Sequence, residues 1–416
     1  MKNKPWLNIL VAAAMLSLAC SLTSRPAVTP TAAPTAVSPT GRQLTVFDAA
    51  FAAVRDQYIP ANYSGVDWKT IGAQYRSQVA AGETDDAFAQ TMRDMLAKLP
   101  PGTANYETRA ERLANVTTNG ASYYGIGAFV SYRANPKPHI VILATISGSP
   151  AEAAGLQPHD SLLAVNGAPF TAADQLAPTQ RIRGDQGTAV TLTVQTPGDA
   201  ARQIQLERAP ITATDSLRGG YLSSLNVAYY RMPVVSDPNV ADSIAGDLAS
   251  ISQTTKLKGI ILDLRIARSD ATEWPLSQML TMFGNGNLGE FYTRSITTPV
   301  TIVGQDVAGS QTLPLVVLVG ADTAGTPEIF AAALQASHRA TVIGMVTHGS
   351  VLGFQTVALP DGSRLTLANS SYRTANNQDM SSKGVTPDHV IDADWDSYTL
   401  ETDPDLGEAL SQLGIQ

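Results

Sequence analysis

The sequence has one cysteine, Cys20, and only five histidines in 416 residues. A single cysteine cannot form a disulfide within the chain or build a cysteine-based metal cluster. No two histidines are four residues apart, the spacing that places two zinc ligands on one helix face. Basic residues are also scarce, since 28 Lys and Arg against 36 Asp and Glu give a net charge of −8. We therefore expect no metal, no cofactor and no nucleic-acid partner, because phosphate binding needs a basic surface.

Long hydrophobic runs are missing as well, and the apolar stretch near the N-terminus is too short to span a bilayer as a stable helix. It follows Lys2 and Lys4 and covers residues 7–19, directly before Cys20. This arrangement is typical of a secretory signal, and its end resembles the lipobox of bacterial lipoproteins. The resemblance implies that residues 1–20 are a lipoprotein-type signal peptide with Cys20 as the lipidation site. Ordinary signal cleavage beside an incidental cysteine is the alternative.

Residues 21–43 are rich in Thr, Pro, Ala and Ser and carry almost no charge. Such a composition cannot bury a core, and its prolines favour an extended chain. It predicts a tether between the lipid anchor and the folded part of the protein. We therefore expect an extracytoplasmic protein that is lipid-anchored to the bacterial cell envelope.

The remaining chain contains three regions that differ in their pattern of apolar residues. Residues 44–118 have helical periodicity, with one apolar stripe around Phe47 and Phe51 and another around Phe88. Short glycine-punctuated strands follow in residues 119–212 and predict a small β-rich module. In residues 213–400, apolar strands alternate with helices, which predicts an α/β core whose mostly parallel sheet is covered by helices. The expected fold class is thus multidomain α/β (α+β), and residues 401–416 are expected to form a C-terminal tail.

The β-rich module resembles a bacterial-type PDZ domain. Residues 150–167 carry the matching Pro-Ala, Ala-Gly-Leu, Asp and Val-Asn-Gly positions, but His159 stands where the family usually has glycine. The segment at residues 124–127 resembles the loop that binds a peptide carboxylate in such domains. Successive backbone N–H groups in a glycine-permitted turn can form such a site. The resemblance implies binding of peptides or protein C-termini; the alternative is a spacer or gate. The predicted peptide-binding residues are Tyr124, Gly125, Ile126 and Gly127.

The order of helical region, PDZ module and α/β core resembles the C-terminal processing peptidases, also called tail-specific proteases. That family uses a serine nucleophile and a lysine general base, which removes the serine proton when desolvation lowers its pKa. The matching segments are residues 259–265, 313–320, 323–328, 340–344, 347–349, 359–362 and the closing Gly-Val-Thr-Pro-Asp at 384–388.

The residues that the resemblance assigns to catalysis are absent. Gly325 stands at the nucleophile position, and Ser350 stands at the position of the lysine base. Ile266 and Ala267 follow the Asp-Leu-Arg motif, where the family has Asn and a glycine pair whose amides can approach a developing oxyanion. Several departures at one site predict a protein that does not cleave peptides.

Weaker alternatives place the chemistry elsewhere. Ser350 and His348 are two residues apart in an extended stretch and so point to the same side, but no orienting acid accompanies them. Thr326 is a possible nucleophile, although a Thr-Pro pair here is typical of a helix N-cap. Gln355 corresponds, displaced by one residue, to the family's orienting glutamine. None of the lysines in the core, at 256, 258 and 383, occupies the base motif.

The sequence therefore predicts an envelope-anchored homologue of the tail-specific proteases that binds peptides or protein C-termini without cleaving them. Two alternatives remain open. One is an active serine-type endopeptidase with an unconventional nucleophile, and the other is a structural component of the envelope.

Overall fold

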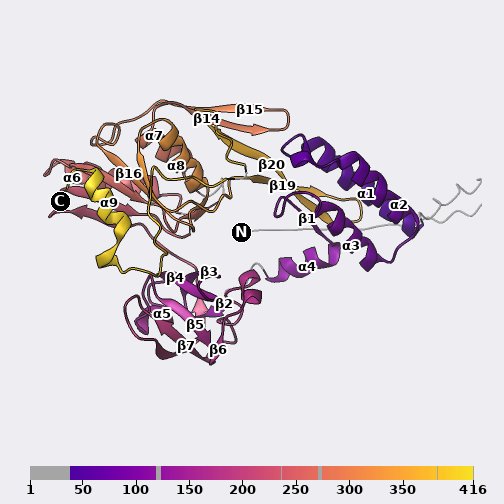
Figure 1. Cartoon of the computed structure of the whole chain (residues 1–416), viewed down its shortest axis with the longest axis horizontal. Coiled ribbons are helices and arrows are strands. Elements are labelled where there is room, and N and C mark those ends of the chain that lie inside the picture. Colours follow the sequence, from indigo (N-terminus) through magenta and orange to yellow (C-terminus); the bar gives the residue numbers. More distant parts are fainter. Residues whose placement is uncertain (1–37, 119–122, 236, 270–273, 382, 416) are drawn as a thin grey trace, which may run out of the picture.

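The computed structural model of the chain describes residues 38–118, 123–235, 237–269, 274–381 and 383–415. They form an N-terminal helical lobe, a β-rich lobe and an α/β core, which lie at the right, bottom and left of Figure 1. The predicted signal, Cys20 and most of the predicted tether lie outside these residues. In the described part of the chain, no helix is long and apolar enough to cross a membrane.

The N-terminal helical lobe starts earlier than predicted. Helix α1 (Pro39–Gln57) begins with Pro39 in its first turn, and the Ser38 hydroxyl accepts a hydrogen bond from the Gly41 amide at 3.0 Å. This cap and the proline at the start favour helix initiation, so residues 39–43 are helical rather than extended. The other helices of this region are η1 (Tyr63–Gly65), α2 (Trp68–Ala80), α3 (Asp85–Leu96) and α4 (Arg109–Thr118).

One strand interrupts the region that was predicted to be helical. Strand β1 (Ala104–Glu107) pairs antiparallel with β20 (Arg364–Thr374), more than 250 residues later in the chain. Leu365 and Leu367 of β20 are fully buried among the side chains of α1, α2 and α3. The N-terminal helices therefore complete their hydrophobic core on a strand of the distant α/β region. Local periodicity contains no information on this partner.

The β-rich lobe has its own hydrophobic core, which contains Ile140, Leu162 and Leu192. Its main sheet has the order β3-β4-β5-β7-β8, and β6 pairs with β5. The fully buried strand β4 lies inside this sheet. The elements of the lobe are β2 (Tyr123–Gly125), β3 (Ala128–Arg133), β4 (His139–Thr145), α5 (Pro150–Ala153), β5 (Ser161–Val165), β6 (Ala168–Pro169), η2 (Ala172–Leu176), β7 (Ala189–Gln195), β8 (Arg202–Glu207) and β9 (Ala209–Ile211).

The α/β core contains the predicted, mostly parallel sheet. Its order is β10-β11-β12-β16-β18-β21, and only the pair β10–β11 is antiparallel. Three helices cover one face of the sheet. The strands are β10 (Arg218–Leu222), β11 (Val227–Arg231), β12 (Gly259–Asp263), β16 (Leu315–Val319), β18 (Thr341–Gly344) and β21 (His389–Val390), and the helices are α6 (Val240–Ser252), α7 (Leu276–Phe283) and α8 (Thr326–Ala336).

A second sheet connects the core with the N-terminal helices (Figure 1). The predicted hairpin around Pro360-Asp361-Gly362 is confirmed as β19 (Gly353–Ala358) and β20. A further hairpin, β14 (Gly286–Thr293) and β15 (Thr297–Ile302), was not predicted and pairs with the other edge of β20. The remaining short elements are β13 (Arg268–Ser269), β17 (Ala324–Gly325) and η3 (Leu400–Thr402).

The predicted C-terminal tail is largely a helix, α9 (Pro404–Gln412). The Asp403 carboxylate caps it by accepting hydrogen bonds from the amides of Asp405 and Leu406. Leu406 and Ala409 pack on the second face of the main sheet. Residues 401–416 are thus not a free tail, because the apolar side of α9 covers strands that would otherwise face water.

Candidate functional site

Gly325, at the position expected for a serine nucleophile, lies in the turn between β16 and α8. Its backbone angles, φ 76° and ψ −130°, belong to a region that is open almost only to glycine. Its amide donates a hydrogen bond to Glu328 Oε2 at 2.9 Å, as in the capping of a helix start. The backbone at this position is therefore built for glycine, and a side-chain nucleophile does not fit the observed conformation.

The segment after β12 fills the space in front of Gly325. Strand β13 pairs in parallel with β17 and places Ser269 opposite Gly325. A side-chain carbon on Gly325 would lie 1.9 Å from the Ser269 carbonyl oxygen, far inside van der Waals contact. Ala267, at the place expected for an oxyanion glycine, is fully buried, and its carbonyl accepts a hydrogen bond from the Ala324 amide at 3.1 Å. This segment is thus bound to the nucleophile turn.

Glu328 connects the nucleophile turn with the loop at the base position. Its carboxylate is completely buried. Oε1 accepts hydrogen bonds from the Gly349 amide at 2.6 Å and from the Thr347 hydroxyl, and Oε2 accepts one from the Ser350 amide at 2.8 Å. With the bond from Gly325, four donors surround one carboxylate. The sequence places Glu328 in the matching segment 323–328, but no local signal predicts its role as the centre of this network.

Ser350, at the position expected for the lysine base, lies on the surface beside His348. The Ser350 hydroxyl contacts His348 Nδ1, and both residues are exposed. The prediction that these two side chains share one side of the chain is therefore confirmed. A serine–histidine catalytic pair also needs a group that orients the ring. Among the described residues, no carboxylate is hydrogen-bonded to His348.

The structure does not bring the other catalytic candidates to this pair. Thr326 is buried, and its hydroxyl has no hydrogen-bond partner among the described residues. The N-cap of α8 is Gly325, so the prediction of Thr326 as the cap was wrong. Gln355 lies in β19, where its side-chain oxygen accepts a hydrogen bond from the Asn369 amide group at 2.7 Å. Neither residue is positioned to activate a hydroxyl at 350.

The predicted peptide-binding loop lies beside a cavity of about 240 Å³ on the PDZ-like lobe. Gly127 has φ 79°, which turns the chain between β2 and β3. Among the described residues, the amides of Ile126 and Gly127 have no hydrogen-bond acceptor, and two successive N–H groups of this kind can bind an anionic group. The cavity is lined by Gly125, Ile126, Gly127, Ala128, Phe129, Val130, Thr179, Ile182, Arg183 and Ala213, while Tyr124 is exposed next to it.

Asp322 joins the PDZ-like lobe to the turn before Gly325. This buried carboxylate accepts a hydrogen bond from the Ser131 hydroxyl at 2.6 Å and forms ion pairs with Arg133 and Arg268. Burial alone would raise the pKa of Asp322, but the two arginines hold it below its usual value. This contact could not be predicted from local sequence patterns, because its residues belong to three separate segments.

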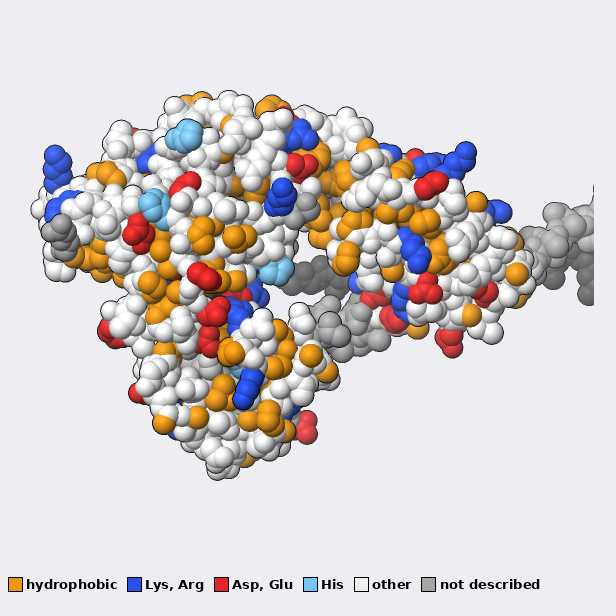
Figure 2. Space-filling model, viewed as in Figure 1, with side chains coloured by type: hydrophobic (Ala, Val, Ile, Leu, Met, Phe, Trp, Pro, Cys, Tyr) orange, Lys and Arg blue, Asp and Glu red, His pale blue; other side chains and the backbone are white. Residues whose placement is uncertain are grey.

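Among the described residues, no three His, Cys, Asp or Glu side chains gather as a metal site requires. On the face seen in Figure 2, basic and acidic side chains are interspersed, and no large basic patch stands out. The expectation of no nucleic-acid partner stays a prediction, and this distribution is consistent with it.

Comparisons with known proteins agree with this architecture. Residues 226–391 match peptidase family S41, residues 116–195 match the PDZ domain, and residues 43–97 match the tricorn protease C1 domain. A carboxyl-terminal-processing protease of Synechocystis sp. is 28% identical over 361 residues, covering 84% of this chain and 81% of its own length. The carboxy-terminal processing protease CtpA of Bacillus subtilis is 26% identical and covers 76% of this chain and 66% of its own length.

The fold is also that of a solved relative. A structure described as a photosystem II D1 C-terminal processing protease superposes with a TM-score of 0.62 at 24% sequence identity. It covers 84% of this chain and 93% of its own. The helical lobe, the PDZ domain and the core are thus arranged as one known architecture. The core of the chain, residues 226–391, is therefore similar to the C-terminal processing peptidases of family S41, and residues 116–195 match a PDZ domain.

Proposed function

We propose that this protein is a non-cleaving member of the C-terminal processing peptidases of family S41. In this proposal, it binds protein C-termini through the PDZ cavity. The observation that carries the proposal is the 1.9 Å approach of the Ser269 carbonyl oxygen to the side-chain position of Gly325. A serine side chain at this position would clash with that oxygen, and the base position holds Ser350. What remains for function is the PDZ domain, whose Ile126 and Gly127 amides have no acceptor among the described residues and suit a terminal carboxylate.

The experiment compares binding and cleavage of one peptide. A fluorescent peptide with an apolar C-terminal residue is titrated with the purified protein, and its amidated form serves as the reference. We expect binding of the free carboxylate and at least about tenfold weaker binding of the amide, since hydrogen bonds to a charged group contribute about 1.5–3 kcal/mol. Mass spectrometry of the same mixture after prolonged incubation should show the intact peptide. Equal affinity for both peptides contradicts the carboxylate site, and cleavage products contradict the non-cleaving assignment.

A matched pair of variants locates the binding site. Ala213 lines the cavity and is exposed, so Ala213→Trp should fill the cavity and abolish peptide binding. Ala201 is equally exposed but lies in the β7–β8 turn, outside this cavity. Ala201→Trp should leave the affinity unchanged. Loss of binding in both variants, or in neither, places the peptide elsewhere. A purely structural envelope component would bind no tail peptide in any form.

A second candidate function rests on the contact between Ser350 and His348. In this alternative, Ser350 is the nucleophile of an unconventional peptidase and His348 removes its proton. Its test is direct, because cleavage of an unstructured, C-terminally tagged substrate would have to disappear in Ser350→Ala and in His348→Ala. We favour the non-cleaving function, since both residues are exposed and no carboxylate among the described residues orients the ring.

We also propose that the protein works at the cell envelope, tethered through a lipid on Cys20. The proposal is supported by the position of the only cysteine at the end of a short apolar stretch. Metabolic labelling with a fatty-acid analogue should label the wild-type protein, and Cys20→Ser should remove the label and release the protein from membranes. A labelled Cys20→Ser variant would exclude this anchor.

A further inference from the structure

The PDZ domain and the protease-like core have separate hydrophobic cores and meet at a small cluster of buried side chains. Trp395 and Tyr398, from the segment before α9, form the core side of this cluster. On the PDZ side, His159 has φ 76°, a left-handed conformation that is uncommon for residues other than glycine. Since the domain resemblance assigns a glycine to this position, the histidine replaces a residue that fits the backbone better.

The His159 side chain is inserted between the two domains. Only 1% of the residue is exposed. Its ring stacks on Trp395 with 4.1 Å between the ring centroids and an interplanar angle of 18°. Nδ1 lies 2.6 Å from the Trp395 carbonyl oxygen, to which it donates a hydrogen bond. In return, the Trp395 indole N–H donates to the Ile142 carbonyl of the PDZ domain at 2.9 Å.

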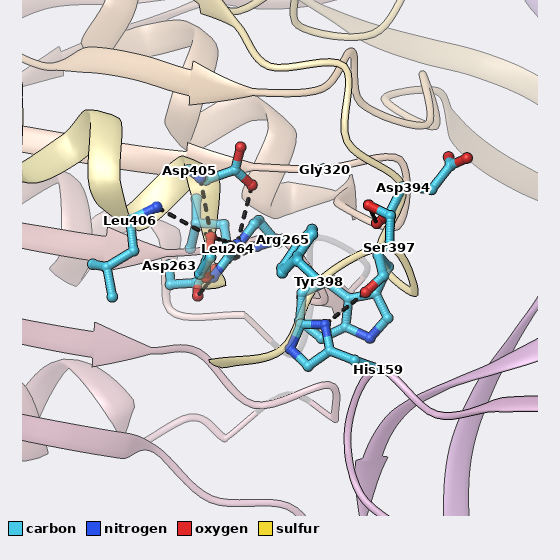
Figure 3. A network of polar contacts seen from close by, with 12 residues as sticks. His159, Asp263, Leu264, Arg265, Gly320, Asp394, Ser397, Tyr398, Asp405 and Leu406 are labelled. Atoms are coloured by element: carbon cyan, nitrogen blue, oxygen red, sulfur yellow. Dashed lines mark hydrogen bonds and ion pairs between the residues drawn. The ribbon is translucent and has the colours of Figure 1, made fainter. Parts of the chain in front are cut away.

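A buried charge cluster around Arg265 lies next to the rings of Trp395 and Tyr398 (Figure 3). The Arg265 guanidinium lies 5.4 Å from the centroid of the Trp395 ring and 6.0 Å from that of Tyr398. It is 3% exposed and forms ion pairs with Asp263, Asp403 and Asp405. His159 is thus connected through two rings to a fixed positive charge of the core.

This geometry requires a neutral His159 ring. One proton resides on Nδ1 for the bond to Trp395, whereas Nε2 is buried and has no partner among the described residues. A second proton on Nε2 would therefore be an unsolvated positive charge. Burial lowers the pKa of His159, and the charge of Arg265 lowers it further. The hydrogen bond to Trp395 and the nearby carboxylates Asp263 and Asp403 act in the opposite direction but do not outweigh the burial.

We propose that His159 and Trp395 form a proton-sensitive latch, which holds the PDZ domain on the core when His159 is neutral and releases it when His159 takes up a second proton. The latch also reaches the peptide site. Phe129 of β3 packs against the interdomain cluster, while its neighbours Ala128 and Val130 line the peptide cavity. Release of the latch therefore changes the support of the strand that forms the cavity, and peptide binding is coupled to docking.

The direction of the pH dependence follows from the lowered pKa. In the docked state, the pKa of His159 is below the ordinary value of 6.5. The released ring has the ordinary pKa and therefore takes up its second proton at a higher pH than the docked ring. Docking is therefore at full strength above pH 6.5 and weakens as the pH falls below it, about tenfold for each unit of difference between the two pKa values.

Three other charged groups near the interface must be separated from this effect. Glu401 belongs to η3 and interacts electrostatically with His159. Asp405 takes up its proton in the same range, because burial raises its pKa to about 6. His139 pairs with Asp396 across the domain boundary at 2.8 Å, and this ion pair raises the pKa of His139 above its ordinary value despite the opposing burial. Protonation of His139 strengthens docking, so its effect has the opposite sign to that of His159.

Hydrogen–deuterium exchange of residues 139–145 and 394–398, corrected for intrinsic exchange, tests the latch between pH 8 and pH 5.5. We expect protection in both segments of the full-length protein to decrease as the pH is lowered. His159→Gly should lower protection at pH 8. It should also remove the decrease in protection that the wild-type protein shows between pH 8 and pH 5.5. Asp405→Asn and Glu401→Gln should keep the wild-type dependence, and His139→Gln should make it steeper.

The proposal is overturned if protection in the wild-type protein is constant over this range, or if His159→Gly retains the same pH dependence. A second variant guards against a folding defect in His159→Gly. Trp395→Phe keeps a stacking ring but loses the indole N–H, so it should reduce protection and still respond to pH. These outcomes are independent of peptide cleavage, and so they test the latch separately from the proposed function.

Discussion

The carbonyl oxygen of Ser269 occupies the place that a side chain on Gly325 would need. Restoring a nucleophile by one substitution should therefore fail. We predict that Gly325→Ser lowers the free energy of unfolding by about 2–4 kcal/mol, because it adds both a clash and a strained backbone angle. Urea unfolding would measure the loss, and a peptidase assay should detect no gain of activity.

The control for this variant is Gly246→Ser in α6. Gly246 has no neighbour within 4 Å of an added side-chain carbon, and its φ is not in the left-handed region. We expect this substitution to be neutral or slightly stabilising, as replacement of a helical glycine usually is. Equal stability of both variants would show that the segment around Ser269 moves aside easily.

The carboxylate of Glu328 should be important for stability although it catalyses nothing in our proposal. Glu328→Gln leaves one acceptor oxygen for the four donors and places an amide N–H against backbone N–H groups. We predict a loss of about 2–4 kcal/mol in the free energy of unfolding and faster hydrogen exchange of residues 347–350. The exposed Glu207→Gln is the matched control and should change stability by less than about 0.5 kcal/mol.

Asp405 is predicted to destabilise the folded protein at neutral pH. Burial raises its pKa to about 6, and one of its oxygens has no hydrogen-bond partner among the described residues. The folded state therefore favours the protonated acid. The free energy of unfolding increases as the pH falls from about 6, the pKa in the folded protein, toward 3.8, the ordinary pKa of the group. Asp405→Asn should raise the free energy of unfolding at pH 8 by on the order of 2 kcal/mol and have little effect near pH 4. The same gain at both pH values would contradict this explanation.

Arg265 should respond in the opposite way to its partner Asp405. Arg265→Met removes the positive charge and leaves Asp263 and Asp403 buried without their counter-ion. Breaking a buried ion pair in this way costs about 3–5 kcal/mol, so we expect poor folding at pH 7. The double variant with Asp405→Asn should recover part of the loss, and a thermal unfolding series of the four proteins would show it. Strict additivity would mean that the two residues do not interact.

The ion pair of His139 and Asp396 predicts a second, opposite pH effect. The pKa of His139 is raised and that of Asp396 is lowered, so the folded protein favours the charged form of both groups. Its contribution is complete below pH 6.5 and is lost as the pH rises through the raised pKa of His139. His139→Gln should therefore lower stability by about 1 kcal/mol at pH 6 and by less at pH 8.5. A larger effect at the higher pH would reverse the assignment.

The parts of the fold that depend on local patterns could be predicted from the sequence. Apolar strands alternating with helices identify the core, and Pro360-Asp361-Gly362 identifies its hairpin. Strand β1 and helix α9 were missed for a common reason. Each is defined by the surface it covers, and that surface is contributed by a distant segment. A short polar strand or a terminal helix has no strong signal of its own.

The candidate site shows the same division. The absence of a nucleophile at 325 and of a lysine at 350 is visible in the sequence. The closure of the turn by Ser269 is not visible, because it depends on the pairing of two short strands. His159 was recognisable as an unusual residue at a glycine position, but its partner Trp395 could not be inferred. Contacts between domains follow from tertiary structure, which a single sequence does not specify locally.

The pairing of β1 with β20 also sets the order in which the chain can fold during synthesis. The helices α1, α2 and α3 are made first, yet their hydrophobic core includes Leu359, Leu365 and Leu367. These leucines are synthesised more than 250 residues after α3 begins. The N-terminal helices must therefore wait with exposed apolar faces while the PDZ domain and most of the core emerge. We therefore expect this long-range pairing to form late in synthesis, so that the speed of translation sets how long the helices expose apolar surface.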